Sequence, residues 1–166
     1  MSDDNLVWCL KQKRGIRIIE PNPNLTKAYL KKAISALNTM TAAVKINETD
    51  WITTTAYYAR YFALYALLMK IGIKSEIHDC TINIAKLLSN NGILTPSLIE
   101  DIAKAKQTRI DTQYYVEKEQ SQTAIKRNIE AARKFVLETE KAIDNITTEQ
   151  INSIRAQLKK LKEQAT

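Results

Sequence analysis

The segment "AYYARYFALYALLMKIG", residues 56–72, restricts the fold more than any other part of the sequence. Its residues are almost all apolar or aromatic, so a helix built from it must be covered on most sides. Arg60 lies in the middle of this segment, and a buried guanidinium without a partner is energetically costly. The chain therefore needs several helices around this segment, or a second copy of itself, and an acceptor for Arg60.

Glycine and proline are scarce, with three of each in 166 residues. So few turn-forming residues exclude an all-β sandwich, which needs many tight hairpins. The predicted class is therefore all-α: an antiparallel up-and-down bundle of four core helices, an extra C-terminal helix and a short N-terminal arm. We expect a single domain over residues 1–166, with the arm at 1–23, the bundle at 24–145 and an amphipathic C-terminal helix at 147–163.

Apolar residues that recur at steps of three and four predict the helices. The predicted ranges are 25–46, about 50–71, 76–89, 96–116, 121–145 and 148–163. Asn24 and Ser75 are the expected N-caps of the first and third helices, and Gly72 is the expected stop of the second. The segment "TTEQ" at 147–150 has the form of a capping box. In the arm, "IRIIEP" is expected to be extended.

A formal charge of +7 favours an anionic partner such as RNA, nucleotide or an acidic protein. The charges do not form one block, so a lysine-rich solvated surface is the competing interpretation. Cys9 and Cys80 lie far apart, and with a single histidine no metal site is expected. We expect free thiols in a reducing cytosol. The acidic opening "MSDDNLVW" lacks an apolar run, and Arg60 opposes a membrane span, so a cytoplasmic protein is predicted.

His78 is the first candidate for chemistry. It lies in the first turn of the helix predicted at 76–89, where the helix dipole lowers the pKa of an imidazole. A neutral imidazole near arginines acts as a base. The competing interpretation is a surface or half-buried histidine with a local hydrogen bond.

Arg60 and Arg109 occupy positions where the apolar pattern calls for leucine. Each guanidinium can hold a phosphate by forked hydrogen bonds, or can pair with a carboxylate inside the bundle. Examples of such carboxylates are Asp79, Asp111 and Glu117. For Arg60 the best candidates are the carboxylates of the helix predicted at 96–116 and of the turn before the helix predicted at 76–89. Small residues flank Arg60 at positions 56 and 63, so we predict that Arg60 reaches a polar cleft shared with His78 and Arg109. Stacking on bases and core packing are both open to the tyrosines, with packing favoured; they are Tyr57, Tyr58, Tyr61, Tyr65, Tyr114 and Tyr115.

Three short motifs resemble those of the HEPN superfamily, which comprises small prokaryotic helical bundles. They are "AYYA" at the start of the second long helix, the "KSEIH" turn, and "RIDTQYY" followed by a long closing helix. The opening "WCLKQKRGIRIIEPNPNLTKAYLKKA" is similar to a compact archaeal branch of that group. The resemblance spans about residues 5–145, and in this order and spacing the motifs are moderately specific.

This resemblance implies a homodimer whose groove binds nucleotide or RNA, with no cofactor. Many HEPN relatives are metal-independent ribonuclease toxins encoded beside a minimal nucleotidyltransferase that restrains them. Their catalytic motif is an arginine followed by a histidine four to six residues later, and no arginine lies at that distance before His78. By position the resemblance carries over His78, as a catalytic residue only if the protein is an enzyme, with Arg60 and Arg109 as anion contacts.

Two functions are therefore expected. The first is a homodimeric binding module for nucleotide, RNA or a nucleotidyltransferase partner, as in a toxin–antitoxin type pair. The second is a metal-independent ribonuclease with a rearranged arginine and histidine site at the dimer cleft. The missing motif favours binding over cleavage.

Overall fold

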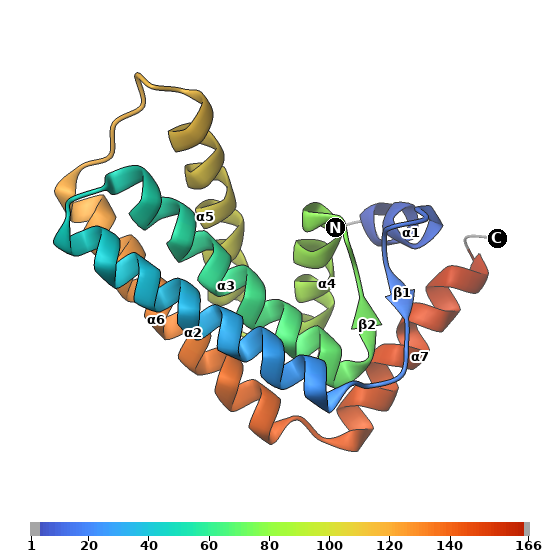
Figure 1. Cartoon of the computed structure of the whole chain (residues 1–166). Helices are drawn as coiled ribbons and strands as arrows, with labels where there is room; N and C mark the ends of the chain where they lie inside the picture. Colours follow the sequence, from blue (N-terminus) through green and yellow to red (C-terminus); the bar gives the residue numbers. More distant parts are fainter. Residues whose placement is uncertain (1–3, 165–166) are drawn as a thin grey trace.

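The computed structural model describes residues 4–164 as an all-α bundle, which confirms the predicted class (Figure 1). Residues 1–3 of the predicted arm and residues 165–166 lie outside the described part. The elements are α1 (Asp4–Lys11), β1 (Arg17–Ile18), α2 (Pro23–Lys45), α3 (Thr49–Ile71), β2 (Ile73–Lys74), α4 (His78–Asn90), α5 (Pro96–Tyr114), α6 (Gln122–Asn145) and α7 (Thr148–Gln164).

Helix α3 is the centre of the bundle, and 16 of its 23 residues are buried. Helix α2 lies antiparallel along one side of α3, and α5 and α6 cover other sides of it (Figure 1). Of the two expected ways to cover this helix, several helices of the chain itself or a second copy, the structure shows the first. The homodimer stays a prediction, but this argument for it no longer holds.

The predicted helix boundaries agree within a few residues, and the differences lie at the caps. Helix α2 begins earlier than expected, with Pro23 in its first turn, because the N-cap is Asn22 rather than Asn24: the Asn22 side chain accepts from the Leu25 N–H at 3.0 Å. Helix α4 begins at His78, and Ser75 instead donates to the Ile77 carbonyl. Gly72 ends α3 in the left-handed conformation as expected, with φ of 84°.

The N-terminal arm is more ordered than the sequence indicated. It contains helix α1, which was not predicted, and strand β1, which lies in the segment expected to be extended. Strand β1 pairs antiparallel with β2, which takes up the residues directly after Gly72. The arm is thus attached to the bundle by backbone hydrogen bonds at the C-terminal end of α3.

Cys9 of α1 and Cys80 of α4 form a disulfide. The expectation of two free thiols is wrong, because the fold brings together two cysteines that are 71 residues apart. Both cysteines are fully buried in the main hydrophobic core. Disulfides persist mainly in oxidising surroundings, so this bond argues against the reducing surroundings expected for the two thiols, and the cytoplasmic location stays a prediction.

Helix α7 packs on the bundle through Ile154 and Leu158, which are fully buried. The capping box is confirmed: the Gln150 N–H donates to the Thr147 hydroxyl at 3.1 Å, and the Thr147 N–H donates to the Gln150 side chain at 3.0 Å. Arg155 of α7 donates to the carbonyls of Ile71 and Gly72 and so caps the C-terminal end of α3. Within residues 4–164, no helix is long and apolar enough to cross a membrane.

Loss of the disulfide should destabilise the fold. Chain-entropy arguments give about 4 kcal/mol for a loop of this length, so Cys80→Ser or reduction of the native protein should lower the thermal midpoint markedly. Thermal unfolding followed by circular dichroism, with and without a reductant, measures the effect. Cys80→Ser itself is the control, since a reductant should not change its midpoint further. Equal midpoints for oxidised and reduced wild-type protein would contradict the stabilising role.

Candidate functional site

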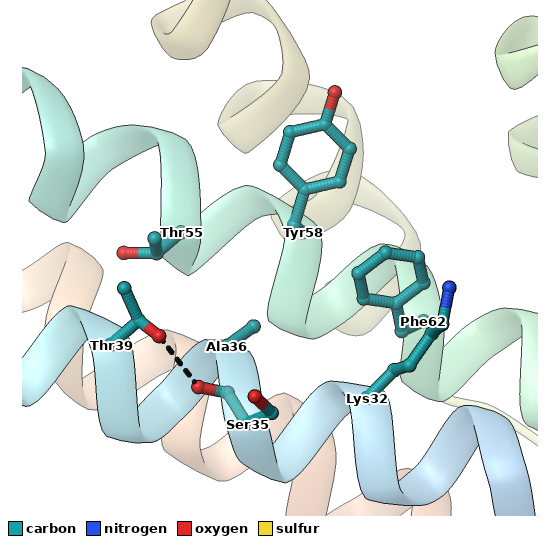
Figure 2. Close-up of a pocket in the computed structure, with 7 residues that line it drawn as sticks. All are labelled: Lys32, Ser35, Ala36, Thr39, Thr55, Tyr58 and Phe62. Atoms are coloured by element: carbon teal, nitrogen blue, oxygen red, sulfur yellow. Dashed lines mark hydrogen bonds between the residues drawn. The ribbon is translucent and has the colours of Figure 1, made fainter.

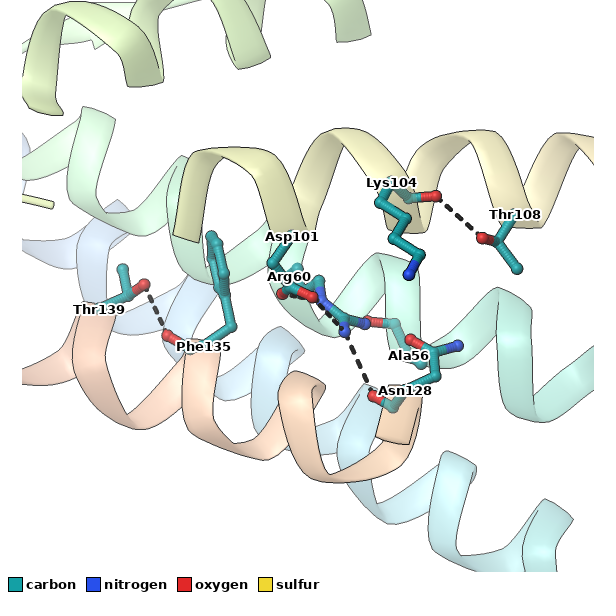
Figure 3. A network of polar contacts seen from close by, with 8 residues as sticks. All are labelled: Ala56, Arg60, Asp101, Lys104, Thr108, Asn128, Phe135 and Thr139. Carbon is teal, nitrogen blue, oxygen red and sulfur yellow. Dashed lines mark hydrogen bonds and ion pairs between the residues drawn. The ribbon is translucent and has the colours of Figure 1, made fainter. Parts of the chain in front are cut away.

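Arg60 is fully buried, and its guanidinium is bonded to three helices (Figure 3). Its Nε donates to Oδ2 of Asp101 in α5 at 2.7 Å, and its Nη2 donates to Oδ1 of the same carboxylate at 3.1 Å. Nη2 also donates to the Asn128 carbonyl in α6 at 3.2 Å, and Nη1 donates to the Ala56 carbonyl in α3 at 3.0 Å. The forked pair with Asp101 is the geometry that makes a buried ion pair tolerable.

These contacts give Arg60 a structural role. A buried guanidinium whose nitrogens all donate inside the protein has no surface to offer an anion, so Arg60 does not share an open cleft with His78 and Arg109. Its partner, Asp101, lies on the helix predicted at 96–116, which confirms the helix expected to supply the carboxylate, although Asp101 is not among the three carboxylates named from the sequence. The helical spacing does indicate that Asp101 faces the core. It lies three residues after Leu98 and four before Ala105, which are both buried on α5.

Arg109 of α5 lies among tyrosines of α3. Its guanidinium carbon is 5.0 Å from the ring centre of Tyr57 and 5.7 Å from that of Tyr58, which is cation–π geometry. Nη1 donates to the Gln113 side chain at 3.1 Å. Nε is buried and, among the described residues, has no hydrogen-bond acceptor. A buried donor without an acceptor is rare in folded proteins, and it singles out Arg109 as a side chain whose polar contacts are incomplete.

His78 is the first residue of α4 and lies against the same tyrosines. Its ring is stacked on Tyr61, with centres 4.1 Å apart and an angle of 7° between the planes. Its Nδ1 is 2.7 Å from the Tyr57 hydroxyl oxygen. The predicted position in the first turn of a helix is confirmed, although His78 is the first helical residue and not the third.

The pKa of His78 is lowered from its ordinary value of 6.5, chiefly because the half-buried ring is poorly solvated as a cation. The positive charges of Arg109 and Lys106 lower it further, while Asp79 acts in the opposite direction. The predicted direction of this pKa shift is thus confirmed, but burial replaces the helix dipole as its main cause. His78 is therefore neutral at pH 7.

The hydrogen bond between Tyr57 and His78 fixes which ring nitrogen is free. Burial raises the pKa of the Tyr57 phenol far above its usual range, and the nearby Tyr61 adds to the shift, so Tyr57 remains protonated. In either tautomer of the neutral imidazole, Nδ1 is engaged with Tyr57. Nε2 is then the nitrogen of His78 that a ligand can use, as a donor or as an acceptor.

The structure thus brings His78 and Arg109 together around three tyrosines, and it places Arg60 in a separate internal network. We call this group the tyrosine cluster; its members are Tyr57, Tyr58, Tyr61, His78 and Arg109. Lys106 lies beside the cluster and forms an ion pair with Asp79. Within residues 4–164, no group of three histidine, cysteine or acidic side chains is placed to hold a metal ion.

The tyrosines expected to pack in the core do so only in part. Tyr57, Tyr61 and Tyr65 are buried and Tyr58 is half-buried, but Tyr114 is 74% exposed and Tyr115 is 46% exposed. Both exposed tyrosines lie at the C-terminal end of α5, where the helix extends past the helices that cover it. Core packing was the wrong expectation for these two.

The model of the family described as HEPN domain matches residues 26–142, which is more than half of the chain. The chain belongs to the HEPN family. HEPN domains are known for functions related to nucleotides and RNA, and some of them have ribonuclease activity. A search of curated proteins gave no match to the chain. The HEPN match contains the whole tyrosine cluster and Arg60, whereas α1, β1 and α7 lie outside it.

Removing one partner of the internal ion pair of this HEPN domain should lower the stability of the fold strongly. Replacing both partners by apolar residues should lower it much less. Asp101→Leu leaves the buried Arg60 cation without its carboxylate and should lower the free energy of unfolding by about 3 kcal/mol. The double variant Arg60→Met with Asp101→Leu should recover most of that loss. Urea unfolding measures both changes, with the exposed Glu100→Gln of the same helix as a variant that barely moves the midpoint. Equal losses in the single and double variants would contradict an Arg60–Asp101 pair.

His78 is the single histidine of the chain, so its proton NMR signal is unambiguous. Its titration should give a pKa below 6.5, and Arg109→Gln should raise that pKa because a neighbouring positive charge is removed. As the pH falls below 6.5, the unfolded chain takes up a proton that the folded chain does not, so stability should decrease. A His78 pKa that does not change in Arg109→Gln would contradict the close approach of the two residues.

Proposed function

We propose that this HEPN protein binds nucleotide or single-stranded RNA at the tyrosine cluster without cleaving it. The observation that carries the proposal is the half-buried guanidinium of Arg109, which has one nitrogen, Nε, without an acceptor among the described residues and lies beside a neutral imidazole and aromatic faces. A phosphate oxygen is the acceptor that best completes a guanidinium held in this way.

Each side chain of the cluster has a task in this proposal. Arg109 binds a phosphate, with the positive charge of Lys106 nearby. Tyr58 is half-buried and offers an aromatic face on which a base can stack. His78 contributes Nε2 to a ribose hydroxyl or a phosphate. The net charge of +7 supports the approach of such a polyanion.

The chemistry of the cluster favours binding over cleavage. Cleavage through the ribose 2′-hydroxyl needs both a base and an acid that exchange protons near neutral pH. His78 supplies one such group, while the raised pKa of Tyr57 makes its phenol a poor second one. The arginine-to-histidine motif of catalytic HEPN relatives is also absent from the sequence.

Ribonuclease activity is the second candidate function. The observation that favours it is the short hydrogen bond between Tyr57 and His78, which holds the His78 ring in one orientation with Nε2 free. A two-fold axis near His78 would bring two such rings together, one as base and one as acid.

A protein partner completes the proposal. The homodimer and a minimal nucleotidyltransferase, as in a toxin–antitoxin type pair, follow from the family resemblance. Large apolar side chains are exposed at the α2–α3 connection and after α5, and they offer surface for such contacts; they are Val44, Ile46, Trp51, Tyr114, Tyr115 and Val116.

RNA binding should depend on Arg109. Wild-type protein should bind a fluorescein-labelled, mixed-sequence single-stranded RNA, and Arg109→Gln should weaken this binding by about tenfold or more, because one charge-assisted hydrogen bond is lost. The slope of log affinity against log salt should decrease by about 0.7, as expected for one lost phosphate contact. Fluorescence anisotropy over a salt series measures both values.

Arg127→Gln is the matched control, because it removes an exposed arginine of α6 that lies outside the cluster. Equal affinities for the Arg109 and Arg127 variants, or no binding by wild-type protein, would contradict the proposed site. The same RNA on a denaturing gel tests cleavage. A product that forms with wild-type protein and not with His78→Ala would establish the ribonuclease instead.

A further inference from the structure

A groove between α2 and α3 lies next to the tyrosine cluster (Figure 2). It has a volume of about 370 Å³. Helix α3 contributes Thr55, Tyr58 and Phe62, and the facing side is formed by residues of α2, namely Lys32, Ser35, Ala36 and Thr39. The groove thus combines an aromatic side with a side of small and hydroxyl-bearing residues.

The aromatic side is suited to a flat ring. Tyr58 and Phe62 are half-buried, with ring centres 5.7 Å apart and an angle of 28° between the planes. Lys32 lies beside Phe62, with its Nζ 5.2 Å from the ring centre, as Figure 2 shows. Aromatic faces next to a cation are the features that bind the bases and backbone of single-stranded nucleic acid.

One hydroxyl on each side of the groove supplies hydrogen-bond acceptors. The hydroxyls of Thr39 and Thr55 donate to carbonyls of their own helices, to Ser35 at 3.0 Å and to Trp51 at 2.6 Å. Their protons are therefore engaged, and their lone pairs remain for the amino group of a base.

Charge also favours an anionic occupant. Helix α2 carries four lysines and no aspartate or glutamate, and no acidic residue lines the groove. An apolar protein segment would not use this charge, whereas a phosphate backbone would, and the aromatic rings of Tyr58 and Phe62 favour nucleic acid over an acidic peptide.

Tyr58 connects the groove to the tyrosine cluster. It lines the groove, and its ring centre is also 5.7 Å from the guanidinium carbon of Arg109. Arg109 thus contacts the Tyr58 ring, and the Tyr58 ring contacts the Phe62 ring, with both distances below 6 Å. This separation is short enough for one strand to contact both residues.

We propose that the α2–α3 groove is a second base-binding subsite, which holds the base of the next nucleotide of a single-stranded RNA whose first nucleotide is bound at the tyrosine cluster with its phosphate at Arg109. This inference rests on the proposed function, because it takes the Arg109 contact as its starting point. The subsite requires a ligand of at least two nucleotides. The bound strand would extend from the tyrosine cluster towards Lys32.

Calorimetric titration of the full chain with AMP, with the 5′-phosphorylated adenylate dinucleotide and with the same dinucleotide lacking its second base tests the subsite. Stacking on one further aromatic ring should make the intact dinucleotide bind about tenfold more tightly than the abasic one. Ser35→Gln places a longer side chain in the groove at an exposed helix position and should abolish this difference. Phe62→Leu removes the ring and should do the same. Neither variant should change the affinity for AMP.

Asn38→Gln is the control, because this exposed α2 residue does not line the groove, and it should keep the full difference. A dinucleotide preference that survives in both groove variants would overturn the subsite while leaving the Arg109 contact in place. Failure of wild-type protein to bind either AMP or dinucleotide would instead overturn the proposed function, and the subsite with it. Light scattering provides a further test: a dimer that Ser35→Gln converts to a monomer would identify the groove as a contact between copies.

Discussion

The pair formed by Arg60 and Asp101 holds the bundle in register. The arginine belongs to α3, its carboxylate partner to α5, and a further acceptor, the Asn128 carbonyl, to α6. Apolar packing alone tolerates small slides of one helix along another, but a forked ion pair inside a core fixes the level at which the helices meet. Arg109 lies on the same helix as Asp101, two turns further along. The ion pair between Arg60 and Asp101 therefore also fixes the position along α3 at which Arg109 contacts Tyr57.

The burial of α3 has a second effect. Because α2, α4, α5 and α6 all pack on it, α3 is complete within one chain, and its tyrosines lie at different depths. Tyr57 is deep enough for its pKa to be raised and for its hydroxyl to fix His78, whereas Tyr58, the next residue, reaches the surface. One helix thus provides both the rigid base of the tyrosine cluster and the aromatic face that a ligand can contact.

The sequence predicted the helices well because apolar spacing and caps are local signals. It also singled out Arg60, Arg109 and His78, since polar residues on apolar faces are visible in the same pattern. It did not separate their roles, because the partner of Arg60 depends on how α5 is rotated and how far it is shifted along α3, and no local pattern records either. The disulfide was missed for a similar reason: Cys9 and Cys80 meet only after α1, an element with a weak sequence signal, has docked on α4.

That disulfide also changes the connectivity of the molecule. The chain from Cys9 to Cys80 becomes a closed covalent ring that contains β1, α2, α3 and β2. The rest of α4, followed by α5, α6 and α7, continues from Cys80 outside this ring. A single cut by a protease anywhere inside the ring would open it without releasing a fragment. Both walls of the α2–α3 groove and all three tyrosines of the cluster belong to this ring, so such a cut would leave them covalently joined to the rest of the chain.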